Sequence, residues 1–376
     1  MDDSFAFNIW EAISTCSKLD KIRFHKCHLL RAKEKLVDAI KHARILRVTY
    51  TYYDFKGIKP PLTTTSPPRL PNLQSLDILR SREYSCSGDI SPIIQHAPNL
   101  VSLKMDPQLA PDPASYMHEL SVSISGCPKL QDIKLDHMTL LKEETTMVLD
   151  AITDAKRLDW GVGEISEQAF RSIMSRHART ITHLHLSESP GLTSSMAQTI
   201  MISCSLLESL KLSTISGTNL VRINTVDQGN QSSSKNTGRL ILGEDWICLR
   251  LRALKLQLDL SSITMNIDRD TPEGESLFQR QQQLEQYHAF RQIGRLTLLQ
   301  DLNISESQYD TRNKRSLDLR LGENGGGLEG LAALKKLNTI KFRNTKQELS
   351  EKEIGWMISN WLHLYRIGDL SSSIIH

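Results

Sequence analysis

The stretch Cys16-Ser17-Lys18-Leu19-Asp20-Lys21-Ile22-Arg23-Phe24 decides the fold, because its apolar residues follow the pattern Leu-x-x-Leu-x-Leu. The pattern recurs along the chain, and the first residue of each occurrence is its anchor. The first eight anchors are Leu19, Ile45, Leu73, Leu100, Leu130, Ala155, Ile181 and Leu207. They are separated by 26, 28, 27, 30, 25, 26 and 26 residues. Seven consecutive intervals of similar length indicate an internal repeat, with one structural unit in each period.

The repeat continues after residue 212 at longer intervals, with anchors at Leu251, Leu299, Leu337 and a degenerate Leu364, which makes about twelve repeats. Alternating apolar residues predict a short strand that turns every second side chain inward. Periods of about 20–29 residues are typical of leucine-rich repeats. We therefore expect an α/β leucine-rich-repeat solenoid, a horseshoe with parallel strands on its concave face and helices on its convex face.

The remainder of each repeat predicts the convex helices. Residues 29–43 carry four apolar residues at near-helical spacing, namely Leu29, Leu36, Val37 and Ile40. Asp112 followed by Pro113 fits an N-cap and the first position of a helix. Ser350 and Glu353 form the pattern of a capping box.

The composition fits a chain that folds. Of its 376 residues, 39% are hydrophobic and 24% are charged, which excludes disorder throughout. The formal net charge of +3 gives no overall attraction to nucleic acid or membranes. The first ten residues carry acids where a secretory signal carries Lys or Arg, and no apolar run reaches the roughly 18–20 residues of a membrane span. We expect an intracellular protein of the cytoplasm or nucleus.

Two interruptions divide the array. We expect a regular array of about eight repeats over residues 1–212, a disordered insertion over 213–245, and a tail over 371–376. Residues 246–370 continue the array, with long insertions at 258–295 and 305–330. Within the first of these, residues 272–295 predict an extended helix. This helix is either an appendage that binds a partner or an enlarged convex helix that packs on its neighbours.

Four of the six cysteines keep a fixed phase in the repeat. Cys16, Cys127, Cys204 and Cys248 each lie three residues before an anchor, where other repeats have mostly apolar residues. The equivalent positions are His42, Leu70, Ala97, Ile152, Ala178, Leu296, Leu334 and Trp361. This phase predicts reduced thiols that behave as small buried hydrophobic residues. Cys27 falls at the turn after the first strand and Cys86 is out of phase, so no metal site or disulfide framework is expected.

The repeat with phased cysteines resembles a known family. The unit Cys16-x-x-Leu-x-x-Ile-x-Phe-x-x-Cys-x-Leu29 is similar to the cysteine-containing, ribonuclease-inhibitor-like (RNI-like) repeats of F-box/LRR proteins. The segment 246–368 resembles the C-terminal part of fungal members, through residues 246–256 (WICLRLRALKL), 327–337 (GLEGLAALKKL) and 353–361 (EIGWMISNW). In that family, the repeats recruit a target protein, and an N-terminal F-box docks on a ubiquitin-ligase adaptor. Here residues 5–15 already have the pattern of a repeat helix, so a cullin-ligase adaptor is expected as a partner only if an F-box lies upstream.

Motifs for catalysis are missing from the sequence. It has no G-x-S-x-G, H-E-x-x-H, paired C-x-x-C or dinucleotide fingerprint, so we expect no catalytic residues and no cofactor. His183 and His185 share one face of a strand but have no Cys or acidic companion at ligand spacing, so no metal is expected. A GTPase-activating leucine-rich-repeat protein would need a catalytic arginine on a particular loop, and no arginine stands out.

The concave strands carry the candidate binding residues. The residues between the two inward strand positions are Arg23, Thr49, Asp77, Lys104, Lys134, Asp159, His185, Lys211, Lys255, Asn303 and Lys341. Six of these eleven are Lys or Arg and two are Asp, whereas the whole chain has 46 basic and 43 acidic residues. With flanking basic residues, the predicted partner-binding stripe consists of Lys21, Arg23, Arg47, Lys104, Lys134, His185, Lys211, Lys255, Lys341 and Arg343. His25, Lys26 and Arg366 extend it.

This stripe has two interpretations. Its cations could hold an acidic or phosphorylated segment of a protein partner, or they could form a solvated face on which Lys keeps the strands soluble. The leading functional hypothesis is a protein-interaction scaffold, the target-recognition region of an F-box/LRR ubiquitin-ligase receptor. The alternatives are an F-box-independent regulator, inhibitor or scaffold and, third, a GTPase-activating protein. Without aromatic residues interleaved in the stripe, a nucleic-acid partner is not expected.

Overall fold

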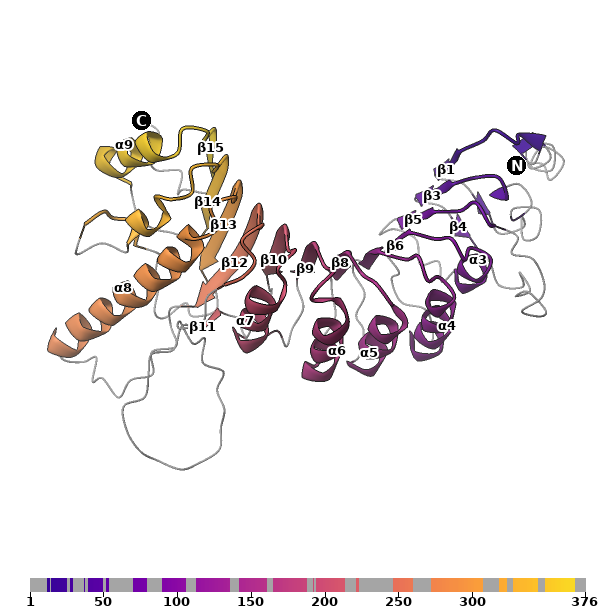
Figure 1. The fold of residues 1–376 in the computed structure, drawn as a ribbon, viewed down its shortest axis with the longest axis horizontal. Helices are drawn as coiled ribbons and strands as arrows, with labels where there is room; N and C mark the ends of the chain where they lie inside the picture. Colours follow the sequence, from indigo (N-terminus) through magenta and orange to yellow (C-terminus); the bar gives the residue numbers. More distant parts are fainter. Residues whose placement is uncertain are drawn as a thin grey trace, which may run out of the picture. The chain divides into compact units, whose positions relative to one another are not determined.

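A computed structural model gives the arrangement of the chain. It describes residues 12–13, 15–25, 28–29, 37, 40–49, 52–53, 70–79, 90–105, 113–135, 142–160, 165–187, 192, 194–213, 221–222, 246–259, 272–306, 318–322, 327–343 and 349–368. The chain divides into two compact units, unit 1 over Met1–Ile181 and unit 2 over Thr182–His376. In the described parts of both, strands and helices alternate as a leucine-rich-repeat solenoid (Figure 1).

Unit 1 contains a parallel sheet with helices on one face (Figure 1). In spatial order, the strands are β1 (Lys21–His25), β3 (Ile45–Thr49), β5 (Ser75–Leu79), β6 (Ser102–Met105), β7 (Asp132–Leu135) and β8 (Arg157–Trp160). The helices are α3 (Ser91–Gln95), α4 (Pro113–Ser125), α5 (Lys142–Ala151) and α6 (Glu167–His177). β2 (His28–Leu29) and β4 (Tyr52–Tyr53) form a separate parallel pair. The order of the main strands follows the sequence, as stacked repeats require.

Unit 2 repeats this plan with larger connections. Its strands are β9 (His183–Ser187), β10 (Ser209–Ser213), β12 (Ala253–Asp259), β13 (Asp301–Glu306), β14 (Thr339–Arg343) and β15 (Arg366–Gly368), with β11 (Val221–Arg222) beside β12. Its helical elements are α7 (Ser194–Ser203), α8 (Pro272–Gly294), the 3₁₀ helix η1 (Leu328–Leu331) and α9 (Glu351–Asn360). None of the described helices is long and apolar enough to cross a membrane.

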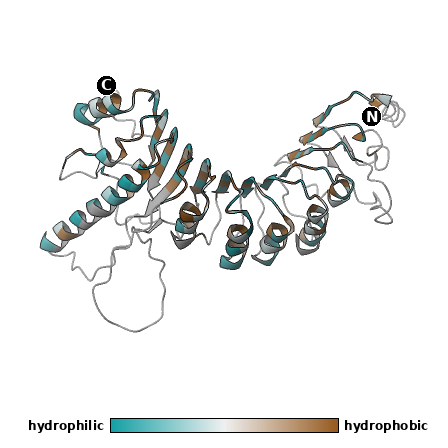
Figure 2. Ribbon diagram, in the orientation of Figure 1, coloured by the Kyte–Doolittle hydropathy of each residue, from teal (hydrophilic) through white to brown (hydrophobic). Residues whose placement is uncertain are grey.

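The core of each unit is built from the predicted repeat pattern. Hydrophobic and hydrophilic residues alternate along the strands (Figure 2). In unit 2, the inward residue Leu210 is in register with Leu184 and Leu254, and all three are buried. Within each unit, the carbonyl before a strand also accepts two backbone N–H groups of the next repeat, as Glu208 O does from Arg252 and Ala253. Each repeat is thus held to the next by apolar stacking and by backbone hydrogen bonds.

The second repeat corrects the predicted register. Its anchor is Ala43 rather than Ile45, because Leu46 and Val48 are the buried inward residues and Leu46 lies in register with Leu76. The first two intervals are therefore 24 and 30 residues, since position 43 lies 24 after position 19 and 30 before position 73. The residue between the inward positions is consequently Arg47, and the prediction of Thr49 was wrong.

Several predicted helix boundaries are confirmed. α4 begins at Pro113, and α9 begins after the capping box in which Ser350 N donates to Glu353 Oε2 at 3.1 Å. Val37 and Ile40 are helical and buried, whereas Leu36 lies outside the described residues. Leu29 was wrongly assigned to this helix. It belongs to β2, because its backbone pairs with β4.

The phased cysteines agree with the prediction at three positions. Cys127, Cys204 and Cys248 are free and buried, and the corrected register places the buried Ile40 at the same position in the second repeat. Cys16 is exposed, which contradicts the prediction. It belongs to the first described repeat, so no earlier described repeat covers it as Ile94 and Ala97 cover Cys127. Cys27 and Cys86 lie outside the described residues.

The interruptions of the array contain regular structure. β11 lies inside the segment 213–245, and its two residues pair with Leu258 and Asp259, so this part of the predicted disordered insertion is a strand. The expected extended helix over 272–295 is α8. Its C-terminal half packs in unit 2, where Phe290 and Ile293 are fully buried, whereas Leu277 in its N-terminal half is 59% exposed. The C-terminal half is therefore the enlarged helix that packs on its neighbours, and partner binding by the N-terminal half stays a prediction.

Candidate functional site

The face of each sheet opposite the core is the open face. Because side chains alternate along a strand, the residue between the two inward positions points to this face. We call the set of these residues in one unit its central row. Strand register brings the members of a central row next to one another at the usual strand spacing of about 4.8 Å. The row therefore determines the charge that a partner lying across the strands would meet.

The central row of unit 1 contains its own counter-charges. In spatial order, it consists of Arg23, Arg47, Asp77, Lys104, Lys134 and Asp159. Arg47 Nε lies 2.6 Å from Asp77 Oδ2, and Lys134 Nζ lies 3.3 Å from Asp159 Oδ2. Each adjacent pair of cations is thus followed by a carboxylate that binds one of them. Two of the four cations in this central row are therefore paired within it, which fits a solvated face.

The central row of unit 2 has a different composition. It consists of His185, Lys211, Lys255, Asn303, Lys341 and Gly368, with no Asp or Glu. Lys211 is exposed, and Lys255 and Lys341 are half-buried. Within the described part of the chain, neither Lys211 nor Lys341 has an ion-pair partner. The row itself therefore contains no carboxylate that could neutralise its lysines.

A groove of about 540 Å³ runs along this open face of unit 2. Its polar lining consists of His183, His185, Ser209, Lys211, Lys255, Asp301, Asn303, Thr339, Lys341 and Arg366. Four of these side chains are Lys or Arg and one is a carboxylate, Asp301, so the lining has a formal excess of three positive charges with neutral histidines. A groove with this excess is suited to an anionic ligand.

Small residues shape the groove. Ala253 forms part of its lining, on β12 two residues before Lys255 and beside Ser209 of β10. A Cβ added to Gly368 would meet Lys341 Cγ at 3.1 Å, so the glycine leaves room for the stem of this lysine. At the other end, His185 Nε2 lies 2.9 Å from Ser209 Oγ, and His183 Nδ1 lies 3.0 Å from Thr182 Oγ1. These contacts fix the two imidazole rings at the wall of the groove.

The predicted stripe therefore separates into two sets. His185, Lys211, Lys255 and Lys341 meet in the groove, together with Arg366. The remaining described members lie on the open face of unit 1, and they are Lys21, Arg23, Arg47, Lys104 and Lys134. The backbone of Arg343 pairs with Ser305, but its side chain lies outside the described residues.

Sequence reasoning missed other groove residues. Ser209, Asp301 and Thr339 occupy the first position of their strands, two residues before the central row. Residues two apart on a strand share a face, so the strand pattern itself contains the signal that identifies them. No three described His, Cys, Asp or Glu side chains are grouped so as to hold a metal ion.

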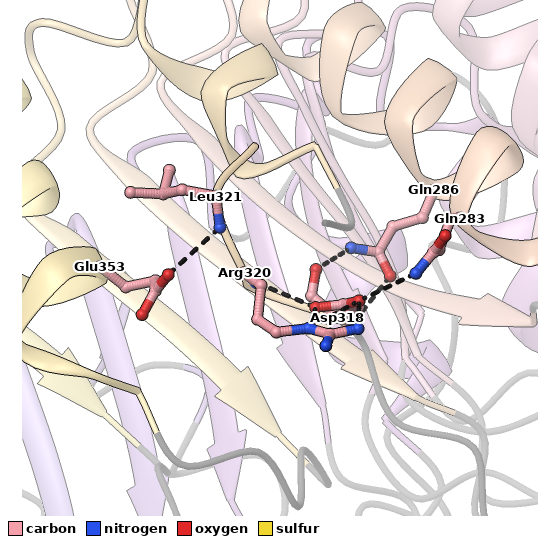
Figure 3. Close-up of polar contacts among 6 residues, drawn as sticks. All are labelled: Gln283, Gln286, Asp318, Arg320, Leu321 and Glu353. Carbon is pink, nitrogen blue, oxygen red and sulfur yellow. Dashed lines mark hydrogen bonds and ion pairs between the residues drawn. The ribbon is translucent and has the colours of Figure 1, made fainter. Parts of the chain in front are cut away.

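A second polar cluster in unit 2 holds one of the insertions in place (Figure 3). Asp318 N donates to Gln286 Oε1 at 2.9 Å, and the Gln286 amide donates to Asp318 O. Gln283 Nε2 donates to Asp318 Oδ2 at 3.3 Å, and Arg320 forms a bidentate pair with the same carboxylate at 3.0 and 2.7 Å. The cluster thus joins residues 318–320 to α8.

Glu353 of α9 holds the next residue of this insertion. Leu321 N donates to Glu353 Oε1 at 3.2 Å (Figure 3). Burial acts to raise the pKa of Glu353, but hydrogen bonds from the Ser350 side chain and from the backbone N–H groups of Leu321 and Ser350 outweigh it and lower the pKa. The side chain is therefore a charged structural acceptor. Its partners belong to the insertion and the helix cap, so this cluster explains folding rather than binding.

Comparisons with known proteins assign no family to the chain. No protein-family model matches the sequence, and no curated protein matches it. Among solved structures, the chain is similar to the crystal structure of an internalin from Listeria monocytogenes, with 12% sequence identity and a TM-score of 0.45. The alignment covers 96% of this chain and 83% of the internalin chain. These values assign no partner or activity.

Proposed function

We propose that this chain is a non-catalytic protein-interaction scaffold, and that the groove of unit 2 binds an acidic or phosphorylated segment of a partner protein. The observation that carries this proposal is the charge of the groove, with four cations and one carboxylate in its lining. Unit 1 offers the contrast within the same chain, since its central row pairs Arg47 with Asp77 and Lys134 with Asp159. Complementary charge across an interface favours specificity and fast association.

The finer proposal is that the scaffold recruits a target to a ubiquitin ligase. Its support is the resemblance of the repeats to F-box/LRR proteins, in the phased cysteines of the first repeat and in residues 246–368. The alternative is a regulator or inhibitor that works without an F-box. The two differ in one partner, the ligase adaptor.

The scaffold proposal is tested by charge reversal within the groove. The variant Lys211→Glu/Lys255→Glu/Lys341→Glu is compared with Lys104→Glu, which changes the same strand position in unit 1. Partners are captured with the tagged full-length protein, and their binding is then measured with purified components over a salt series. We expect the groove variant to bind its partners at least about tenfold more weakly than the wild type. We also expect the wild-type affinity to fall steeply as the salt concentration rises. Equal loss in the Lys104→Glu control, or no loss in either protein, would contradict the proposal.

The ligase proposal is tested in the same capture from native extract, by mass spectrometry of both bait and partners. Bait peptides from a segment upstream of Met1, together with a cullin-ligase adaptor, are the expected result. A bait that starts at Met1 and brings no adaptor would support the F-box-independent regulator.

A further inference from the structure

Two lysines face each other directly in the groove. Lys211 on β10 and Lys255 on β12 are register partners, so their side chains leave adjacent strands at the same level. Like charges directly opposite each other in a sheet are destabilising. Unit 1 contains the same arrangement at Lys104 and Lys134, but there Lys134 binds Asp159. In unit 2, the register partner of Lys255 on β13 is Asn303, so the central row supplies no carboxylate there.

The surroundings of these lysines are small and polar. Ser209 and Ala253 precede them by two residues on the same strands and face, and both line the groove. His183 and His185 approach from β9, where His185 contacts the Ser209 hydroxyl at 2.9 Å. The Asp301 carboxylate lies beside Ala253, in register on β13. Two ammonium groups, a hydroxyl and two imidazole rings line the same end of the groove. These groups are donors for a compact anion with several acceptor oxygens.

We propose that this part of the groove is a subsite for a phosphate monoester on a protein segment, with Lys211 and Lys255 as its principal ligands. The inference rests on the proposed function and specifies its partner chemistry. A phosphorylated side chain carries close to two negative charges and three acceptor oxygens at neutral pH. Its charge and its three oxygens match a pair of facing lysines, whereas a carboxylate carries a single negative charge and two oxygens.

The rest of the groove favours a protein segment over a free phosphate. The groove continues from this subsite across β13, β14 and β15, where Asp301, Thr339, Lys341 and Arg366 line it. In a peptide that lies across these strands, the residues next to the phosphorylated side chain meet both hydrogen-bond donors and hydrogen-bond acceptors. The single carboxylate, Asp301, lies on the strand next to Ala253 and suits a backbone N–H or a basic side chain of that segment.

The test uses short labelled Gly-Ala peptides that differ only in their central residue, which is phosphoserine, glutamate or serine. Fluorescence anisotropy gives their dissociation constants with the full-length protein. We expect phosphoserine to bind at least about tenfold more tightly than glutamate, because it forms charge-assisted contacts with both lysines. Lys211→Gln or Lys255→Gln should weaken phosphoserine binding at least about fivefold, and the control Lys104→Gln should change it less than about twofold.

Three results would overturn the subsite. Equal binding of the glutamate and phosphoserine peptides would mean a general acidic groove, which leaves the scaffold proposal intact. An unchanged dissociation constant in both Lys211→Gln and Lys255→Gln would mean that phosphate binds elsewhere. Inorganic phosphate that competes as well as the unlabelled phosphoserine peptide would mean a free anion rather than a protein segment. Partner capture by the groove variant is a separate measurement, so the two proposals can fail independently.

Discussion

At the scale of the residue, His177 is a titratable group inside unit 1. Its ring is almost fully buried, and Nδ1 accepts a hydrogen bond from Ala155 N at 3.3 Å. Nε2 is buried without a hydrogen-bond partner. Burial lowers the pKa of His177, and Arg176 adds to this effect while Asp154 opposes it. The folded protein therefore holds this imidazole in its neutral form.

A neutral buried histidine makes stability depend on pH. Below the ordinary pKa of about 6.5, this histidine binds a proton in the unfolded chain but stays neutral in the folded chain. The free energy of unfolding therefore falls as pH is lowered and rises as pH is raised. We expect His177→Gln to reduce this slope between about pH 7.5 and 5, by at most about 1.4 kcal/mol per pH unit for one proton. Urea unfolding at several pH values measures it. His118→Gln, at an exposed position, is the control, and an equal reduction there would contradict the assignment.

The cysteines should differ in reactivity. Burial raises the pKa of Cys127 to about 11 and those of Cys204 and Cys248 to about 12, whereas Cys16 is exposed. Because the thiolate is the nucleophile, alkylation of the native protein near pH 7.5 should label Cys16 and spare these three buried thiols until the protein is denatured. Peptide mapping by mass spectrometry identifies the labelled positions. Rapid labelling of Cys204 or Cys248 in the native protein would contradict their place in the core.

At the scale of the element, α8 and η1 approach through glycine. A Cβ added to Gly294 would lie 1.9 Å from Gly330 O, and one added to Gly330 would lie 3.0 Å from Arg291 N. Gly327, the N-cap of η1, has a φ of +80° and lies beside Tyr287 of α8. The segment 327–337, which contributed to the family resemblance, therefore contains glycines that bring two backbones together.

This contact gives a matched pair of substitutions. Gly294→Ala should lower the free energy of unfolding by about 1–3 kcal/mol, because the methyl group has no room beside Gly330 O. Gly355→Ala in α9 should raise it by about 0.5–1 kcal/mol, since nothing lies within 4 Å of the added Cβ and alanine favours the helix. Chemical denaturation measures both. A similar effect of the two substitutions would show that the α8–η1 contact is not tight.

The sequence predicted the elements better than their exact register or their polar contacts. The Leu-x-x-Leu-x-Leu pattern identified the strands because burial repeats with the period of the fold. It failed at Ile45, where two apolar residues adjoin and Leu46 is the one that stacks on Leu76. Part of the groove lining was predicted, through the stripe members His185, Lys211, Lys255 and Lys341. The ion pairs in the central row of unit 1 could not be predicted, because they depend on which strands are neighbours. The pairing of β11 with β12 was missed because no local sequence pattern indicates it.

At the scale of the whole molecule, the near-balanced charge of the chain conceals two different faces. The formal net charge is +3, yet the central row of unit 1 contains two carboxylates, each paired with a cation, while the row of unit 2 contains none. A charge count over the chain cannot distinguish these cases. The strand register can, because it determines which side chains are neighbours.

The two facing lysines of unit 2 predict that substitutions which weaken binding will raise stability. Lys211→Gln removes the like charge opposite Lys255 and should raise the free energy of unfolding by about 0.2–1 kcal/mol at low salt. This gain should shrink at high salt, where the repulsion is screened. Lys104→Gln, where Asp77 is a neighbour on the adjacent strand, should show no gain. Urea unfolding at two salt concentrations tests this, and destabilisation by Lys211→Gln at low salt would contradict it.

The backbone ladder that joins the repeats also has an evolutionary consequence. Carbonyls such as Glu208 O position the next strand through main-chain hydrogen bonds, so the side chains of the central row contribute little to holding the fold. A lineage can therefore exchange these residues one repeat at a time and change its target while the scaffold persists. Partner choice in such a protein should drift faster than architecture.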